Sequence, residues 1–197
     1  LYTSFLSNFY SEIINLSSYE KIVDSSGSAI HGIILSEVEN IEVSMIHLIR
    51  DPRAVANSNK RDKSNPASES KKKMSKKGVI RTSISWRMVN IILNFLRRKK
   101  FSSSSVAKYE KLFSNPIKEF KKISESIDTV FRKENLFTSS NSVTFESDHM
   151  GQGNPVRFKN GKVNLYVDEK WKTEMKKRDR ELCKYMCYDI MKKYNYI

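Results

Sequence analysis

The spacing of apolar and polar residues along the chain predicts both helices and strands. Helical spacing of apolar residues predicts long helices over 1–18, 83–99 and 116–131, and a last helical stretch capped by Asp168 that continues to Ile190. Short apolar runs predict strands over 19–24, 43–49 and 106–109, with a short helix over 29–35 between the first two. Because strands alternate with helices, we expect an α/β fold in three layers, a mostly parallel sheet of three or more strands flanked by helices.

The predicted helix over 83–99 has two faces of different character. We expect its apolar face to be buried: Ile84, Met88, Ile91, Ile92, Phe95 and Leu96. We expect its polar face to be exposed: Arg87, Asn90, Asn94 and Arg97. Trp86 is interpreted as a packing residue.

The predicted strand over 43–49 is followed by a strong signal for the start of a helix. Asp51 suits the N-cap, and Pro52 suits the first helical position, where its missing N–H costs nothing. Arg50 therefore ends a strand, at the edge where open α/β sheets bind ligands. Ser58 follows about two helical turns later, so that both side chains could reach one anion. The alternative is that Arg50 caps a carbonyl or pairs with a neighbouring acid.

Two stretches have little or no apolar periodicity. Residues 59–78 are polar and basic, and we interpret them as a flexible surface loop. Residues 132–167 contain Gly153 and Arg157, a combination suited to a loop that folds over a nucleotide, since glycine permits close backbone approach and arginine binds phosphate. An ordinary glycine-rich surface turn is the alternative.

The composition fits a single domain of 197 residues with a formal net charge of +14. Such a charge favours anionic partners, including nucleotides, nucleic acid, acidic glycans and membrane surfaces, although a lysine-rich surface also simply aids solubility. No stretch approaches the ~20 apolar residues that span a bilayer. The two cysteines, Cys183 and Cys187, lie four residues apart on a predicted helix, too far apart for a disulfide, and are expected to be core thiols. No metal-ligand set is evident.

The segment around Arg50, HLIRDPRAVANS, resembles the 3′-phosphate-binding motif of sulfotransferases that use 3′-phosphoadenosine 5′-phosphosulfate (PAPS), carbohydrate sulfotransferases above all. Further similarities follow in the family's order along the chain. They are IVDSS at 22–26, VAKYEKL at 106–112 with Pro116, GNPVRF at 153–158 and KKYNY at 192–196.

The resemblance implies roles for particular residues. Arg50 and Ser58 would hold the nucleotide 3′-phosphate, and Tyr109 would lie near the adenine unless it is a core tyrosine. Gly153, Asn154 and Arg157 would belong to a loop that closes over the nucleotide. The implied cofactor is PAPS as sulfuryl donor, without a metal; the implied partner is a hydroxyl-bearing acceptor, a glycan rather than nucleic acid; and the implied location is the Golgi.

The sequence also departs from the family. Gly27 stands where the family usually has a lysine facing the phosphosulfate. No glycine-rich phosphosulfate-binding loop precedes Tyr19, so we expect residues 1–197 to be the C-terminal portion of a sulfotransferase domain. The opening segment and any membrane anchor would then lie outside this sequence. The catalytic base is unassigned, and we expect this portion alone to be inactive. The alternative function is a non-catalytic basic module, a degenerate sulfotransferase or a binder of glycan or nucleic acid.

Overall fold

The computed structural model describes residues 2–17, 19–25, 28–61, 76–98, 101–145 and 161–197. The expected α/β class is confirmed. The helices are α1 (Tyr2–Leu16), α2 (Ala29–Leu35), α3 (Pro52–Lys60), α4 (Val79–Leu96), α5 (Tyr109–Ser114), α6 (Pro116–Ser126), the 3₁₀ turn η1 (Lys133–Asn135), α7 (Trp171–Glu174), α8 (Lys177–Met186) and α9 (Tyr188–Lys193). The strands are β1 (Ser44–Ile49), β2 (Ser103–Lys108), β3 (Phe137–Ser139), β4 (Ser142–Phe145) and β5 (Gly161–Asn164).

The described strands form two separate sheets. β1 and β2 pair in parallel, from Ser44 opposite Ser103 to Ile49 opposite Lys108, so their carboxyl ends lie at the same edge. β3, β4 and β5 form an antiparallel sheet in that order. The expected mostly parallel sheet of three or more strands is therefore wrong for the described part of the chain. The antiparallel sheet also contains residues from 132–167, where the sequence has little periodicity.

The missing third parallel strand is the predicted one over 19–24. This segment is described without regular structure, and Val23 is 88% exposed. A strand needs a neighbour for its backbone N–H and C=O groups, whereas side chains hold this segment. Lys21 donates to the carbonyl of Asp128 and, at 3.0 Å, to Oγ1 of Thr129. The short apolar run was thus a poor guide to strand formation.

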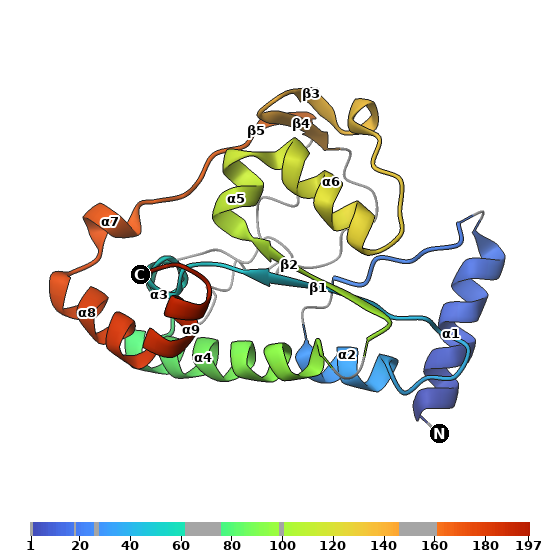
Figure 1. Cartoon of the computed structure of the whole chain (residues 1–197), viewed down its shortest axis with the longest axis horizontal. Helices are drawn as coiled ribbons and strands as arrows, with labels where there is room; N and C mark the ends of the chain where they lie inside the picture. The colour runs from blue at the N-terminus through green and yellow to red at the C-terminus, as the bar shows by residue number, and fades with distance from the viewer. Residues whose placement is uncertain (1, 18, 26–27, 62–75, 99–100, 146–160) are drawn as a thin grey trace, which may run out of the picture.

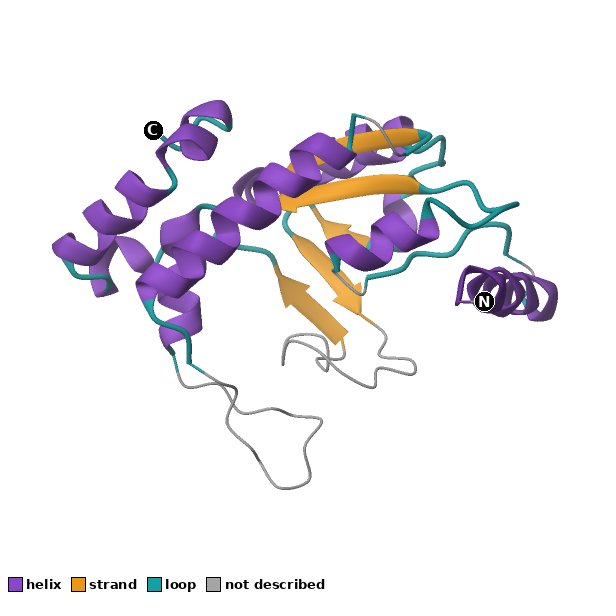
Figure 2. Ribbon diagram, turned by 90° about the horizontal axis from the view of Figure 1, so that it is seen from below, coloured by secondary structure: helices purple, strands orange, loops and turns teal. Residues whose placement is uncertain are grey.

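The helices lie on both sides of the parallel pair. Figures 1 and 2 show α2 and α4 along one side of β1 and β2, with α5, α6 and the antiparallel sheet on the other. The main apolar core joins β1, α3, α4 and the C-terminal helices through residues that include Ile49, Trp86, Cys183, Cys187 and Met191. Both cysteines are buried and free, as predicted.

Several boundaries differ modestly from expectation, among them the starts of α4 at Val79 and of β2 at Ser103. Residues 59–60 of the expected loop belong to α3, while residues 62–75 of that loop lie outside the described residues. Helix α6 ends at Ser126, so Phe131 is beyond it. Phe131 nevertheless packs against the ring of Phe120, with the ring centres 6.1 Å apart.

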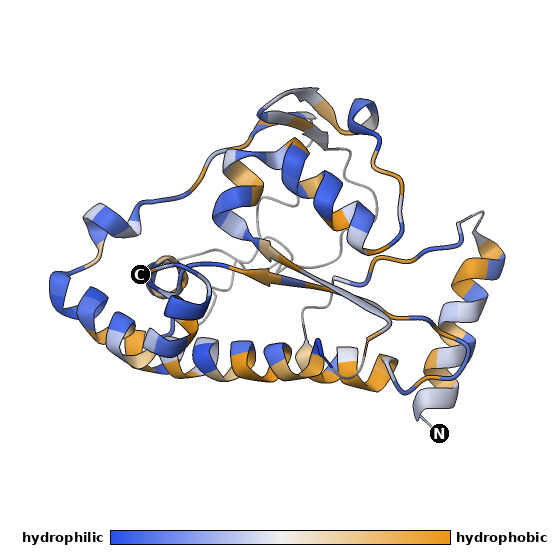
Figure 3. Ribbon diagram, viewed as in Figure 1, coloured by the Kyte–Doolittle hydropathy of each residue, from blue (hydrophilic) through white to orange (hydrophobic). Residues whose placement is uncertain are grey.

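Helix α4 is turned the opposite way from the prediction. Most of the residues expected to be buried are exposed: Ile84, Met88, Ile91, Ile92 and Phe95, leaving only Leu96 in the core. Asn90 and Asn94, expected on the exposed face, are buried. Figure 3 shows apolar colour along the outer edge of α4, away from the strands.

Specific hydrogen bonds explain this orientation of α4. Asn90 Oδ1 lies 2.8 Å from Nε2 of the buried His47 in β1, and Asn90 Nδ2 donates to the carbonyl of Trp86. Asn94 Oδ1 accepts from the Tyr194 hydroxyl. Buried polar groups are costly unless paired. The two asparagines satisfy polar groups of β1 and of the C-terminal segment, a requirement that hydrophobic periodicity does not detect.

Substitutions on the two faces of α4 should separate the observed orientation from the predicted one. Asn90→Ala removes the partner of a buried imidazole and should lower the free energy of unfolding by about 1–3 kcal/mol. Ile84→Ala alters a side chain that is 52% exposed and should cost less than about 1 kcal/mol, against about 2–5 kcal/mol for a core isoleucine. Urea unfolding of both variants measures the difference, and the reverse ranking would contradict the observed orientation.

The stability of the fold should depend on the protonation of His47. Burial lowers the pKa of His47 below its ordinary value; the Asn90 hydrogen bond raises it, and the charges of Arg97 and Lys193 lower it further. The unfolded chain takes up the proton at about pH 6.5, where folded His47 does not. This contribution to stability is therefore complete above about pH 6.5 and is lost progressively as the pH falls below it.

Thermal unfolding measured between about pH 7.5 and pH 5.5 tests this dependence. The melting temperature should fall over this range, and the fall should be smaller in His47→Gln, whose amide does not titrate. An identical fall in the variant would show that other groups control the acid sensitivity.

Candidate functional site

The candidate site lies at the carboxyl edge of the parallel sheet, where β1 leads into α3. Asp51 is the N-cap of α3, accepting from the backbone N–H of Arg53 at 2.8 Å, and Pro52 is in the first turn, both as predicted. The indole N–H of Trp86, a buried packing residue as expected, donates to the carbonyl of Arg50 at 3.0 Å. The backbone of Arg50 is therefore fixed between β1, α3 and α4.

The side chain of Arg50 is half-buried and contacts both an acid and an aromatic ring. Its guanidinium donates to the carbonyl oxygen and to Oδ2 of Asp168, at 3.2 and 3.3 Å. The same guanidinium lies over the ring of Tyr109, 4.2 Å from its centre. Arg50 Nε is buried without a hydrogen-bond partner. Arg50 thus pairs with an acid, which is the alternative that the sequence left open. The acid is 118 residues away in the chain, not a sequence neighbour.

Tyr109 reaches the same edge from the second strand. It is the first residue of α5, directly after β2, and its ring also packs on Phe113 with centres 4.4 Å apart. Burial raises the pKa of Tyr109, and the nearby Arg50 partly opposes this rise. Because β1 and β2 are parallel, residues from their carboxyl ends meet here. Tyr109 therefore lies at the same edge as Arg50.

The remaining predicted site residues divide into two groups. Ser58 lies in α3 and is half-buried. Gly153, Asn154 and Arg157, together with Gly27, lie outside the described residues. Of the predicted site residues, Arg50 and Tyr109 are the pair whose contact the structure describes.

A network of charged residues that the sequence pattern did not predict lies beside Arg50. Arg61, at the end of α3, lies 3.6 Å from Oδ2 of Asp168 through NH1 and donates to Oε2 of Glu174 at 2.7 Å through NH2. Asn57 Nδ2 donates to the same Glu174 oxygen at 2.9 Å. Burial alone raises the pKa of Asp168, but the Lys170 N–H and both arginines outweigh this and lower it. No local sequence signal connects residues this far apart.

The C-terminal segment makes hydrogen bonds to residues that surround the site. Lys108 donates to the carbonyls of Tyr194 and Asn195, and Arg53 donates to the carbonyl of Tyr196 at 3.1 Å. The Tyr196 hydroxyl donates to Oε2 of Glu110 at 2.8 Å. Burial and the neighbouring Glu110 carboxylate both raise the pKa of Tyr196.

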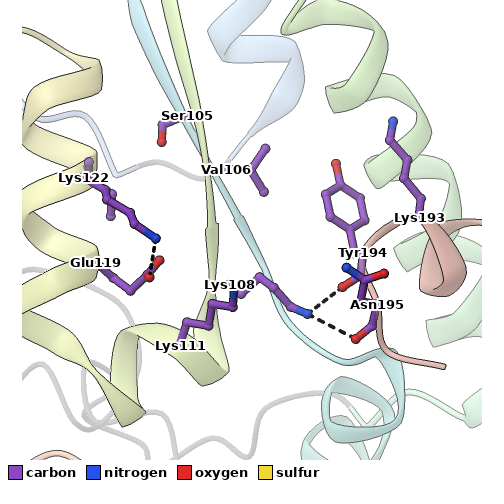
Figure 4. Close-up of a pocket in the computed structure, with 10 residues that line it drawn as sticks. Ser105, Val106, Lys108, Lys111, Glu119, Lys122, Lys193, Tyr194 and Asn195 are labelled. Atoms are coloured by element: carbon purple, nitrogen blue, oxygen red, sulfur yellow. Dashed lines mark hydrogen bonds and ion pairs between the residues drawn. The ribbon is translucent and has the colours of Figure 1, made fainter.

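A separate basic cavity of about 300 Å³ lies beside β2, between α6 and the C-terminal segment (Figure 4). It is lined by four lysines: Lys108, Lys111, Lys122 and Lys193. Lys122 pairs with Glu119 at 3.0 Å, and the amino group of Lys108 is bound to backbone carbonyls. In Figure 4 the lysines point in different directions and do not converge on one point. Neither Arg50, Ser58 nor Tyr109 lines this cavity.

Comparisons with protein-family models, curated proteins and solved structures give no match to this chain. Among the described residues, no helix is both long and apolar enough to cross a membrane. The described part of the chain also contains no group of three or more His, Cys, Asp or Glu residues arranged to hold a metal ion. Candidate chemistry at the sheet edge therefore has to be argued from the side chains themselves.

Glu110 should be an important stabilising residue at this edge. Its carboxylate accepts from the N–H of Asp51 at 3.0 Å and from the Tyr196 hydroxyl. Glu110→Ala leaves the Asp51 N–H without this acceptor and leaves the Tyr196 hydroxyl only its longer contact with the Ile49 carbonyl, at 3.3 Å. We expect a loss of about 2–3 kcal/mol in the free energy of unfolding. Urea unfolding measures this loss. Glu125→Ala is the matched control, since Glu125 makes only an exposed pair with Lys121 and should cost less than about 0.5 kcal/mol. Equal effects in the two variants would contradict the assignment.

Proposed function

We propose that the protein is a PAPS-dependent sulfotransferase, or the C-terminal portion of one, that transfers a sulfuryl group to a hydroxyl of a carbohydrate. One observation carries the proposal. Arg50 and Tyr109 come from two separate segments that resemble the family, and the Arg50 guanidinium lies 4.2 Å from the centre of the Tyr109 ring at one sheet edge. Open α/β sheets bind ligands at this edge.

The described residues fit the nucleotide end of PAPS. Arg50 offers a planar guanidinium for bidentate binding of the 3′-phosphate, and its buried, unpaired Nε is a donor that a phosphate oxygen would satisfy. Ser58 would add a hydroxyl donor from α3. Tyr109 offers an aromatic surface for the adenine. Gly153, Asn154 and Arg157, which lie outside the described residues, would belong to a loop over the nucleotide on the strength of the sequence resemblance alone.

The chemistry proposed is an in-line transfer. The acceptor hydroxyl would attack the sulfur of the phosphosulfate, the bond to the bridging phosphate oxygen would break, and adenosine 3′,5′-bisphosphate would leave. Neither the base that takes the hydroxyl proton nor the phosphosulfate-binding group is assigned among the described residues. The proposal includes the three-layer sulfotransferase fold for the complete domain, a Golgi location and no metal requirement.

Calorimetric titration with adenosine 3′,5′-bisphosphate tests the nucleotide site, with 5′-AMP as the ligand that lacks the 3′-phosphate. The bisphosphate should bind more tightly than 5′-AMP. Arg50→Ala should weaken bisphosphate binding by about 1.5–3 kcal/mol, roughly 10- to 150-fold, because a charge-assisted bidentate contact is lost. The same variant should leave 5′-AMP binding nearly unchanged.

Arg87→Ala is the matched control for this titration. Arg87 is an exposed arginine of α4 that pairs with Asp189 at 2.9 Å, so its removal changes the net charge equally without touching the sheet edge. Equal affinity for the two nucleotides in a folded sample, or an Arg50→Ala variant that binds like the control, would overturn the proposed site.

A second candidate function is a non-catalytic module that binds polyanions, with Lys111 and Lys193 of the basic cavity as its candidate contacts. The net charge of +14 supports the same function. This function predicts binding to a sulfated glycan or nucleic acid that weakens steeply with salt and does not depend on a 3′-phosphate. Titration of a heparin oligosaccharide at two salt concentrations, with Arg50→Ala and with Lys111→Ala, distinguishes the two sites.

A further inference from the structure

We infer that Arg50 and Arg61 together form an oxyanion site, and that Asp168 occupies the place of the anion when no ligand is bound. The site itself rests on the geometry of these three residues. The identity of the anion, a nucleotide 3′-phosphate, rests on the proposed function. Arg61 becomes a second phosphate-binding residue, and Asp168 becomes an internal competitor that the ligand displaces.

The two arginines converge on a single oxygen atom. Arg50 NH2 lies 3.3 Å and Arg61 NH1 lies 3.6 Å from Oδ2 of Asp168. They approach from different elements, Arg50 from the end of β1 and Arg61 from the end of α3. A carboxylate held between two guanidinium groups occupies the position that one oxygen of a phosphate or sulfate would take, since both kinds of anion bind arginine in the same way.

The arginines contact Asp168 at longer distances than arginines contact other acids nearby. Charge-assisted N–H···O contacts are usually about 2.7–2.9 Å long, and Arg53 meets Asp51 at 2.6 Å while Arg61 meets Glu174 at 2.7 Å. Both arginine contacts to Asp168 Oδ2 are longer, at 3.3 and 3.6 Å, and the backbone N–H of Lys170 donates to Asp168 Oδ1 at 3.2 Å. Asp168 also lies in the irregular segment between β5 and α7, which Figure 1 shows as a long connection without helix or strand. Its displacement would break the hydrogen bond from the Lys170 N–H, but no hydrogen bond within a helix or a sheet.

Arg61 is positioned independently of Asp168. Its Nε and NH2 both donate to Oε2 of Glu174, at 3.1 and 2.7 Å. The Glu174 oxygen is itself fixed by Asn57 from α3. Arg61 would therefore stay in place after Asp168 leaves, with NH1 still directed at the anion. A dianionic phosphate has more charge and more acceptor oxygens than the carboxylate it replaces, including one for the unpaired Arg50 Nε.

Calorimetric titration of the full chain with inorganic phosphate, and separately with adenosine 3′,5′-bisphosphate, tests the site. Asp168→Asn removes the competing charge and should increase the affinity for both ligands about tenfold. Arg61→Ala should decrease the affinity for both about tenfold, which is the scale of one charge-assisted hydrogen bond. Glu169→Gln is the matched control for the acid, because Glu169 is the next residue and pairs with Lys172 at 2.6 Å. Arg87→Ala is the control for the arginine. Both controls should stay within about twofold of the parent chain.

The outcomes separate this inference from the proposed function. The two-arginine site would be overturned if Asp168→Asn left the affinities unchanged or weakened them. It would also be overturned if Arg61→Ala left the affinities unchanged. Arg61→Ala decides the matter alone if Asp168→Asn does not fold, since 32% of the Arg61 side chain is exposed at a helix end. If both variants shift phosphate affinity as expected while the bisphosphate binds no better than 5′-AMP, the anion site stands and the nucleotide proposal falls. If the bisphosphate binds better than 5′-AMP but neither variant alters its affinity, the nucleotide proposal stands and the two-arginine site falls.

Discussion

The junction between β1 and α3 is the constraint on which the rest of the structure depends. Three distant parts of the chain converge on its backbone: Trp86 binds the carbonyl of Arg50, Glu110 binds the N–H of Asp51, and the Tyr196 hydroxyl lies 3.3 Å from the carbonyl of Ile49. Backbone groups at the end of a strand cannot all pair within their own sheet. Satisfying them from α4, α5 and the C-terminus joins these elements into one body and fixes the direction in which Arg50 points.

Local signals in the sequence were good predictors, because they depend on residues close together in the chain. Asp51 and Pro52 start α3 as expected, since an N-cap needs only a side chain and an N–H two residues later. The faces of α4 were predicted wrongly because periodicity assumes that apolar residues face the core. Here a buried imidazole, His47, required a polar partner from the helix, and Asn90 supplied it. The prediction of a third parallel strand was wrong for a similar reason, since strand pairing depends on a neighbouring strand that no short segment specifies.

The same difference between local and long-range contacts applies to the candidate site. Arg50 and Tyr109 could be predicted because each ends or follows a strand, and parallel strands bring their carboxyl ends together. Arg61, Asp168 and Glu174 could not, because their contacts join α3 to segments more than 100 residues later. A motif can therefore point to a candidate arginine without revealing which acidic side chain pairs with it.

This balance of charge explains why an acid belongs in a site proposed for an anion. In a chain with a net charge of +14, two half-buried guanidinium groups facing one another would repel each other and lose hydration. Asp168 relieves the repulsion and so stabilises the ligand-free fold. The same contact opposes ligand binding, because an anion must displace the carboxylate before it gains either arginine. The length of the two contacts sets the compromise: they are close enough to neutralise the arginines and loose enough to be exchanged for an anion of higher charge.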